Sequence, residues 1–370
     1  PTYVWLHNDG IPSDNNNYMH LAASADGLKV VRADFADGAQ NVGWPGKVYT
    51  YTHTGVAGVA WDTVSTPALQ GPDHPNAVSG AGWRETWAAA SFGEALALSG
   101  DGLVLAVGLR GARGAGPDYD REWELWTYDW NAASTSWTLR TGAKILAYAA
   151  TGEYSKGRSR ITHVTHVKYI DLSHDGGVMA FGAYQTTGDN APGDPTHHDV
   201  YVYQWSSSNG KWAKRGDVLN PSGTCVQDSD AVWFGDVVKL SADGGVLAIS
   251  DDCPFDNSLL SGAGARRSKA HVYHWNSGTG LYDHFWDTGT ELYGPVITAS
   301  WGLHVGATML SDLSLSDDGD VLAIGNSEIT NPALHERQSY SGYVKMYHAS
   351  ATDYAASGSI IYGPTWYHYL

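Results

Sequence analysis

A pattern of alternating apolar and polar residues recurs five times along the chain and centres each time on an Asp-Gly pair. In LALSGDGLVLAVG, which starts at Leu96, one alternating run leads into Asp101-Gly102 and a second apolar run follows. This pattern predicts two antiparallel strands joined by a tight turn, because Gly supplies a positive φ and Asp bonds its own backbone. The other copies are LAASADGLKVVRA from Leu21, IDLSHDGGVMAFG from Ile170, VKLSADGGVLAIS from Val238 and LSLSDDGDVLAIG from Leu313.

Two further predicted strands follow each Asp-Gly hairpin. The third strand alternates clearly, as in DVYVYQW from Asp199, and the fourth opens with an aromatic residue a few positions later. No amphipathic helical stretch separates one unit from the next. The aromatic residues that open the fourth strands are Trp61, Trp137, Trp212, Tyr282 and Tyr354.

Five such units account for nearly the whole chain, with the Asp-Gly pairs 68 to 75 residues apart. A four-stranded sheet of this size cannot bury its own faces, whereas sheets stacked around an axis bury both. The sequence therefore predicts an all-β fold, a β-propeller of five four-stranded blades that forms a single domain over residues 1–370. The predicted blades span residues 19–72, 92–146, 166–220, 234–295 and 309–363.

Composition and charge narrow the range of partners. The chain has 16 Trp and 22 Tyr against 6 Phe, together with 44 Gly, which is typical of strands joined by turns. The net charge of −17 disfavours nucleic acid, because no basic patch is present to neutralise phosphates. No run of 18 apolar residues occurs, so membrane insertion is not expected.

A second motif precedes the hairpin in two of the units. Phe92-Gly93 stands before LALSGDGLVLAVG, and Phe234-Gly235 stands before VKLSADGGVLAIS. With these residues the chain resembles the FG-GAP family of integrin-α-like β-propeller repeats over about residues 19–363. The resemblance implies a propeller that is used for binding or cell adhesion, often outside the cell.

Two features depart from that family. Integrin-type propellers usually have seven blades, whereas this sequence predicts five. They also often carry a calcium loop of the form DxDxDG, in which several oxygens converge on one cation. The nearest approach in this chain is Ser316-Asp317-Asp318-Gly319-Asp320, which lacks the alternating spacing. No cofactor is therefore expected, and calcium at these turns is disfavoured.

The order of the strands predicts that the long connections gather at one end of the fold. The Asp-Gly turns are minimal, whereas the connections between second and third strands are long, as in residues 185–198 and 251–268. Long ordered loops commonly carry function, so this long-loop face is the predicted binding face. Packing beneath the loops and simple solvation are the alternatives for its candidate residues. These are Trp44, Trp83 and Trp301 for stacking, Arg110, Arg113, Arg266 and Arg267 for anions, and His197 and His198 with Asp189, Asp194 and Asp199 for a metal.

The two cysteines, Cys225 and Cys253, fall on the same predicted face. A disulfide between them and two free thiols are both compatible with the sequence. A disulfide would indicate an oxidising compartment. The chain begins at Pro1 without a Met, which suggests a processed N-terminus, and the predicted location is extracellular or lumenal.

Carboxylates on the inner strands offer a catalytic alternative. Glu94 and Asp236 occupy matching positions after the Phe-Gly pairs and would form a glycosidase-like acid/base pair if they faced one cavity. Polar residues at this place commonly bind water of the central funnel instead. The sequence shows no nucleophile elbow, phosphate-binding loop or HExxH motif, so the chain is not expected to be an enzyme.

The function predicted from the sequence is a non-catalytic protein-interaction or adhesion module. The long-loop face would bind a protein partner or seat the propeller in a larger assembly. A lectin-like carbohydrate-binding propeller is the main alternative, since Trp and Tyr suit glycan ligands. The connections between second and third strands share almost nothing, which favours one asymmetric partner surface over five equal sugar sites.

Overall fold

The computed structural model describes the chain in separate segments. Their residues divide into two compact units, Pro1–Ala147 and Tyr148–Leu370, and each unit is described by itself. The described segments contain strands and turns but no helix. Within them, therefore, no helix has the length and hydropathy to span a membrane. The segments are residues 19–34, 46–56, 61–63, 68–70, 91–110, 123–140, 145–146, 162–187, 196–220, 233–253, 267–287, 310–326 and 343–362.

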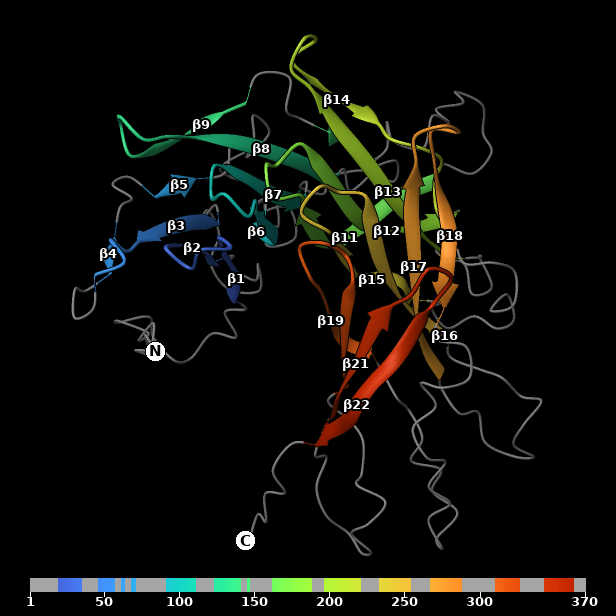
Figure 1. The fold of residues 1–370 in the computed structure, drawn as a ribbon. Helices are drawn as coiled ribbons and strands as arrows, with labels where there is room; N and C mark the ends of the chain where they lie inside the picture. The colour runs from blue at the N-terminus through green and yellow to red at the C-terminus, as the bar shows by residue number, and fades with distance from the viewer. Residues whose placement is uncertain are drawn as a thin grey trace, which may run out of the picture. The chain divides into compact units, whose positions relative to one another are not determined.

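The first unit contains two antiparallel sheets, numbered one and two in chain order (Figure 1). The strands of sheet one are β1 (Met19–Ala23), β2 (Lys29–Asp34), β3 (Lys47–Thr52), β4 (Asp62–Thr63) and β5 (Leu69–Gln70). The strands of sheet two are β6 (Ser91–Leu98), β7 (Val104–Arg110), β8 (Trp123–Asn131), β9 (Ser136–Leu139) and β10 (Ile145–Leu146).

The second unit contains three antiparallel sheets, each with its four strands in sequence order (Figure 1). The strands of sheet three are β11 (Thr162–Leu172), β12 (Val178–Thr187), β13 (Thr196–Ser206) and β14 (Lys211–Lys214). Sheet four has β15 (Trp233–Leu240), β16 (Val246–Cys253), β17 (Arg267–Asn276) and β18 (Leu281–Asp287). Sheet five has β19 (Leu310–Leu315), β20 (Val321–Asn326), β21 (Tyr343–Ala349) and β22 (Tyr354–Tyr362).

These meanders confirm the predicted all-β chain of repeated antiparallel sheets. The fourth strand differs from the prediction in the first unit, where it is interrupted. In sheet one, β4 and β5 both pair with β3, and in sheet two β9 and β10 both pair with β8. In sheet four, β18 ends at Asp287, so the last eight residues of that predicted blade lie outside the described segments.

Alternation along the strands explains how the sheets of a unit pack. In β13, Val200 and Val202 lie on the face toward sheet four, where they join a buried cluster with Leu247 and Ile249 of β16. The alternate residue Tyr201 lies on the other face and stacks on Phe181 with ring centroids 5.6 Å apart. Each fully buried large side chain contributes roughly 1.5–3 kcal/mol, so these clusters hold the layers together. Matching clusters form between sheets four and five and between sheets one and two.

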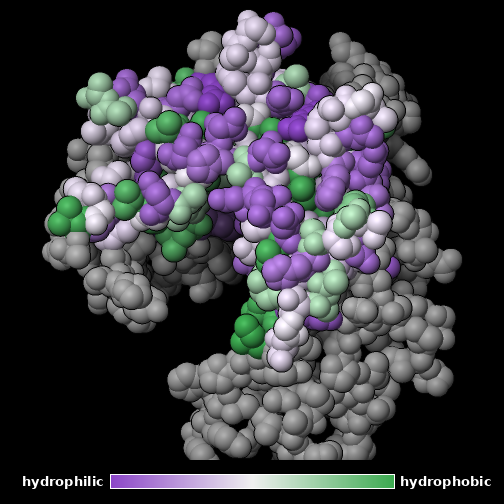
Figure 2. Space-filling model, viewed as in Figure 1, coloured by the Kyte–Doolittle hydropathy of each residue, from purple (hydrophilic) through white to green (hydrophobic). Residues whose placement is uncertain are grey.

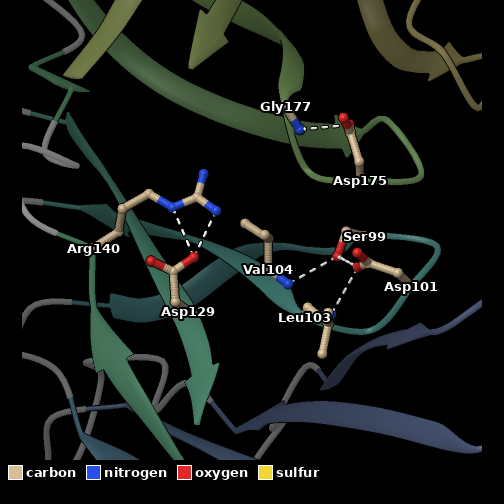
Figure 3. Close-up of polar contacts among 8 residues, drawn as sticks. All are labelled: Ser99, Asp101, Leu103, Val104, Asp129, Arg140, Asp175 and Gly177. Atoms are coloured by element: carbon tan, nitrogen blue, oxygen red, sulfur yellow. Dashed lines mark hydrogen bonds and ion pairs between the residues drawn. The ribbon is translucent and has the colours of Figure 1, made fainter. Parts of the chain in front are cut away.

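The Asp-Gly pair forms one turn that recurs in all five sheets. In sheet two, the Ser99 hydroxyl donates to Asp101 Oδ1 at 2.6 Å and accepts the Val104 amide at 2.8 Å. The same Asp101 oxygen accepts the Leu103 amide at 2.9 Å (Figure 3), and Gly102 has a φ of +68°. These bonds confirm the predicted role of the pair as a turn element. They recur where Ser24, Ser173, Ser241 and Ser316 pair with the Asp two residues on.

Backbone hydrogen bonds join each of these turns to the turn of the following sheet within a unit. In the first unit, the Ala25 amide donates to the Gly100 carbonyl at 2.8 Å. In the second unit, the His174 amide donates to the Ala242 carbonyl, and the Ala242 amide donates to the Asp317 carbonyl, each at 2.8 Å. All of these residues directly follow the serine of their turn. The bonds therefore join neighbouring turns without any need for a particular side chain.

The Phe-Gly motif lets an inner strand approach the preceding sheet closely. Phe234 is buried, and Gly235 follows it with a φ of +81°. A Cβ atom at Gly235 would lie 2.4 Å from Cγ2 of Val200, a distance that no packed side chain tolerates. Gly93 repeats this arrangement against Ala33 in the first unit, at 2.6 Å. The motif thus sets the spacing between sheets rather than a binding site.

Apolar residues on the surface are scattered. On the face drawn in Figure 2, hydrophilic residues cover much of the described surface, and apolar residues form small separate patches. Val344 and Ile361, which are cross-strand neighbours on sheet five, are among the exposed large apolar side chains. Scattered apolar side chains of this kind are ordinary on a protein surface and do not by themselves mark a site.

Candidate functional site

Most of the residues predicted for the binding face lie outside the described segments. The other five lie in strands. Asp199 is buried in β13, in the strand predicted for it, and four residues that were predicted in loops correct the loop bounds. Arg110 ends β7, Arg267 begins β17, and His197 and His198 belong to β13, because strand pairing extends further than the hydrophobic alternation indicated. Those outside the described segments are Trp44, Trp83, Arg113, Asp189, Asp194, Arg266 and Trp301.

The predicted disulfide is not tested by the described residues. Cys253 ends β16, whereas Cys225 lies outside the described segments. No disulfide is found in the part of the chain that the structure describes. The pairing therefore stays a prediction.

The two carboxylates predicted as an acid/base pair lie in different units. Glu94 is in β6 and Asp236 is in β15, each within the bulge that follows a Phe-Gly pair. Since each unit is described by itself, their pairing also stays a prediction. Another inner-strand carboxylate, Asp171, accepts the Leu240 amide at 2.7 Å. Burial raises the pKa of Asp171 although Lys239 acts to lower it, and this carboxylate joins sheets three and four.

A chain of three titratable side chains crosses sheet four. Oδ2 of Asp251 lies 3.1 Å from Nε2 of His271, and Nδ1 of His271 lies 3.4 Å from Nε2 of His284. The three residues come from the adjacent strands β16, β17 and β18. They share one face of the sheet, because His271 pairs with Ile249 and His284 pairs with Tyr273 in the cross-strand register.

Burial decreases along this chain from the carboxylate to the outer strand. Asp251 and His271 are each 6% exposed, whereas His284 is an exposed residue. The ring of Phe234 lies edge-on to His271 with centroids 5.9 Å apart, and the Tyr273 ring lies 5.2 Å from His284. The aromatic rings thus keep the inner part of the chain in apolar surroundings.

One oxygen of the buried carboxylate is not satisfied. Oδ1 of Asp251 is buried and has no hydrogen-bond partner among the described residues. Leaving a buried polar atom without a partner costs about 1–3 kcal/mol, and more when the group is charged. Such an atom requires an explanation, and a ligand or a chemical role at that oxygen supplies one.

The chain of titratable residues distinguishes sheet four from sheets two and three, whereas sheets one and five have the polar residues Asp34 and Asn326 at the position of Asp251. Counted from the turn, Asp251 corresponds to Leu109 in sheet two and to Ala183 in sheet three. His271 likewise corresponds to Trp126 and Tyr201. Apolar or aromatic side chains therefore suffice for packing at both positions. The matching pairs are Asp34 and Tyr49 in sheet one and Asn326 and Lys345 in sheet five, so among the five described sheets a carboxylate stands with a histidine at these two positions in sheet four alone.

This site is not evident from the sequence unless the five units are aligned with one another. The sequence placed Asp251 at the start of a long loop, whereas it pairs with Lys269 inside the β16–β17 ladder. The signal that could have found it is that, of the five aligned units, only the fourth has a carboxylate at the position of Asp251 together with an imidazole at the position of His271.

A second break in the repeat has a structural explanation. Lys29 stands where the other four units have Val, and its Nζ donates to the Gly102 carbonyl at 2.5 Å and lies 4.1 Å from the Trp130 ring centroid. Burial lowers the pKa of Lys29 to about 8, although Asp101 and Asp26 act to raise it. In sheet four the matching carbonyl, of Gly244, accepts a tyrosine hydroxyl instead. Lys29 therefore replaces a structural donor.

An ion pair in sheet two also contributes to structure. Arg140 donates to Oδ1 of Asp129 through Nε at 2.8 Å and Nη2 at 2.6 Å (Figure 3). Asp129 is half exposed, so this pair contributes little to stability. Among the described residues, no group of three or more His, Cys, Asp or Glu side chains is arranged to hold a metal ion. The Asp251 chain is therefore the candidate functional site.

No protein-family model and no curated protein matches the chain. Similar solved structures include the periplasmic gluconolactonase of Pseudomonas aeruginosa, at 12% identity and a TM-score of 0.40, with 94% of this chain and 86% of that one covered. The sialidase of Trypanosoma rangeli is similar at 9% identity and a TM-score of 0.42, with 88% and 45% covered, so the chain spans less than half of it. The β-propeller domain of the trilobed protease from Pyrococcus furiosus is similar at 9% identity and a TM-score of 0.39, with 92% and 70% covered.

These comparisons correct the function predicted from the sequence. The similar solved structures are mostly enzymes, and none of the three above is an adhesion protein. The non-catalytic interaction or adhesion module is therefore withdrawn, together with its lectin-like alternative. At 9–13% identity these likenesses do not establish an activity for this chain. Membership of the FG-GAP family stays a prediction.

Proposed function

We propose that the chain is an acid–base enzyme and that Asp251 is its catalytic group. The observation that carries this proposal is the difference in hydrogen bonding between the two oxygens of the carboxylate. Oδ2 is held by His271 at 3.1 Å, while Oδ1 is buried with no partner among the described residues. A carboxylate that is held through one oxygen and has an unsatisfied second oxygen has one oxygen left to give a proton to a substrate atom or to take one from it.

The surroundings suit this chemistry. The rings of Phe234 and Tyr273 lie beside the histidines of the chain, and the facing sheet contributes apolar residues such as Val200. In apolar surroundings the charge on a carboxylate interacts more strongly with its partners than it does in water. His271 holds the carboxylate in one orientation, which makes it a positioning residue for Asp251.

The position of Asp251 in the sheet agrees with the binding face predicted from the sequence. It lies two residues before the end of β16, at the end of the strand opposite the Asp-Gly turn. The long connections are predicted to gather at that end. The reaction class we assign is hydrolysis that begins with proton transfer to or from a substrate oxygen. This replaces the expectation of a chain without catalysis, which the described residues do not test.

The five sheets are, in this proposal, the five blades of one β-propeller. Support comes from the regular interval between the Asp-Gly pairs and from the backbone bonds that join successive turns within each unit. Each sheet also exposes too much apolar surface to be stable alone. An extracellular or lumenal location is kept as part of the proposal, with a Cys225–Cys253 disulfide as its chemical correlate.

Hydrolysis of a substrate panel tests the catalytic role. The purified chain is assayed against fluorogenic esters and glycosides and against lactones followed by acid release. The variant Asp251→Asn keeps the shape of the side chain but cannot exchange a proton at neutral pH. We expect turnover of at least one class by the wild type, and a loss of at least about a hundredfold in the variant.

Asp283→Asn provides the matched control, because Asp283 is an exposed carboxylate on the same sheet. Its Oδ2 accepts a hydrogen bond from Nδ2 of Asn276. This variant should keep wild-type turnover. The proposal is overturned if the wild type hydrolyses no member of the panel, or if Asp251→Asn retains full turnover while circular dichroism shows it to be folded.

A further inference from the structure

The position of His284 gives the buried carboxylate a connection to solvent. His284 is exposed on β18, the outermost strand of sheet four, whereas Asp251 is buried on β16. His271 lies between them and is within hydrogen-bonding reach of both, at 3.1 Å and 3.4 Å. The three side chains therefore form a continuous line of donors and acceptors that crosses three strands.

The tautomers of both histidines follow from the carboxylate. When Asp251 is a carboxylate it only accepts hydrogen bonds, and Nε2 of His271 then carries the proton that points to Oδ2. Nδ1 of a neutral His271 is then an acceptor, and it receives the Nε2 proton of His284. Every hydrogen bond in the line consequently runs in one direction, from the outer strand to the carboxylate.

We infer that His284 and His271 are a proton-transfer line that exchanges protons between solvent and Asp251. His284 takes one proton from water, passes its Nε2 proton to Nδ1 of His271, and the Nε2 proton of His271 passes to Oδ2 of Asp251. One proton enters and one arrives, and both imidazoles end neutral in their Nδ1-protonated tautomers. The carboxylate becomes a carboxylic acid with its proton on Oδ2, and a half-turn of the carboxyl group about Cβ–Cγ brings that proton to the position of Oδ1. The reverse sequence restores the starting state. This inference rests on the proposed function, in which Asp251 must return to its starting protonation state after each turnover.

The other described residues around the line differ from the two histidines in their chemistry. Phe234 and Tyr273 are the ring neighbours of His271, besides His284 itself, and the cluster from the facing sheet is apolar. Lys269 is the cross-strand neighbour of Asp251 and is partly buried. A lysine ammonium donates hydrogen bonds but accepts none, so it does not relay protons inward in the way that an imidazole does.

Sheets two and three show that the line is not a requirement of the fold. The positions of His271 and His284 are held there by Trp126 and Leu139 in one sheet and by Tyr201 and Lys214 in the other. None of these four side chains both accepts and donates a proton through two ring atoms. A proton line across the sheet is therefore confined to sheet four among these three sheets.

The inference is tested without any substrate, by nitrogen-15 NMR of the histidine side chains in the intact chain. The ring nitrogen shifts of His271 should show the Nε2-protonated tautomer, and its imidazole proton should exchange with water through His284. In the variant His284→Gln, which hydrogen bonds but cannot transfer a proton, we expect exchange at His271 to slow at least tenfold. His174→Gln is the matched control, since His174 is an exposed histidine on a turn of the same unit.

Each outcome bears on one proposal separately. Unchanged exchange at His271 in His284→Gln overturns the proton line, even if the wild type hydrolyses a substrate. Slowed exchange supports the line, even if no member of the substrate panel is turned over and the catalytic proposal fails. An Nδ1-protonated His271 also overturns the line, and this measurement needs only the wild-type protein. Because His284 is exposed on an edge strand, its replacement leaves the buried clusters intact.

Discussion

The amide nitrogen of Ala242 lies 2.8 Å from the carbonyl oxygen of Asp317, so the turn of sheet four donates a hydrogen bond to the turn of sheet five. Ala242 is the second residue of its turn, a position at which proline is well accommodated. Ala242→Pro therefore removes this donor with little other change. We expect it to lower the free energy of unfolding by about 1 kcal/mol in urea denaturation, relative to its control.

The control is Asp317→Pro, which makes the same backbone change at the matching position of sheet five. The Asp317 carbonyl remains available to Ala242, and no bond from the Asp317 amide to another turn is found among the described residues. Equal stability of the two proline variants would show that the bond between turns contributes nothing measurable.

Gly235→Ala should be among the most destabilising small substitutions in the chain. The new Cβ would meet Cγ2 of Val200 at 2.4 Å, and the φ of +81° is unfavourable for alanine. Gly280 has a similar φ of +71°, but a Cβ atom at that position would meet no other atom within 4 Å, so Gly280→Ala isolates the backbone term. That control should cost about 1–2 kcal/mol, and Gly235→Ala clearly more. Thermal unfolding of both variants makes the comparison, and equal losses would refute the close packing.

Ser241→Ala should reduce the resistance of the fold to acid. The hydrogen bond from Ser241, followed by the Gly245 amide, lowers the pKa of Asp243 below 3.8. A depressed pKa stabilises the folded state above the unfolded pKa, and this contribution is lost as the pH falls through the folded pKa. The variant should cost about 1 kcal/mol at pH 6 and less at pH 2.5. Urea denaturation across this range is the measurement, and a constant difference would contradict the assignment.

Lys29 and Trp137 should behave as a compensating pair. Lys29→Val leaves the Gly102 carbonyl without its donor, and we expect a loss of about 1–2 kcal/mol. Adding Trp137→Tyr recreates the arrangement of sheet four, in which the Tyr282 hydroxyl donates to the Gly244 carbonyl at 2.5 Å. The double variant should be more stable than Lys29→Val alone. Trp137→Tyr by itself loses the indole bond to Thr50 and changes the ring contacts with Lys29 and Trp130, so a double-mutant cycle in urea is needed to separate these effects.

The free energy of unfolding should depend on pH in a way that reflects the lowered pKa of Lys29. Its pKa falls from 10.5 to about 8 on folding, mainly through burial, so the folded protein holds fewer protons than the unfolded chain between these values. Stability conferred by Lys29 should therefore rise with pH across that window. The difference in unfolding free energy between wild type and Lys29→Val should shift in favour of the wild type from pH 7.5 to pH 10. A shift in the opposite direction would mean that the amine is stabilised as a cation.

Much of the fold was predictable because it is repeated. The five Asp-Gly hairpins follow from local chemistry. The turn needs a positive φ at Gly102 and its counterparts, and a glycine in the sequence indicates where that is possible. The interrupted fourth strand of the first unit was not predictable, because β4 and β5 are only two residues long and carry little alternation. Pairing between strands, rather than local pattern, decides where such short elements begin and end.

The candidate site was less accessible to sequence reasoning for a related reason. Asp251 follows an apolar run and precedes polar residues, so by local pattern it belongs to a loop. Only the ladder with β17 brings it into the sheet, and only the sheet brings His271 and His284 beside it. Contacts of this kind join residues 20 and 13 positions apart and leave no periodic trace.

The hydrogen bonds between turns have a consequence for how repeat units can be added to chains of this kind. Ala242 uses its amide toward one neighbour and its carbonyl toward the other, so the joint is the same on both sides and does not depend on which residue is present. A duplicated unit inserted into such a chain brings its own turn amide and turn carbonyl. It needs no matching change of sequence in the neighbouring units. The strand interiors of the new copy can then change in sequence while the backbone hydrogen bonds between the turns stay the same.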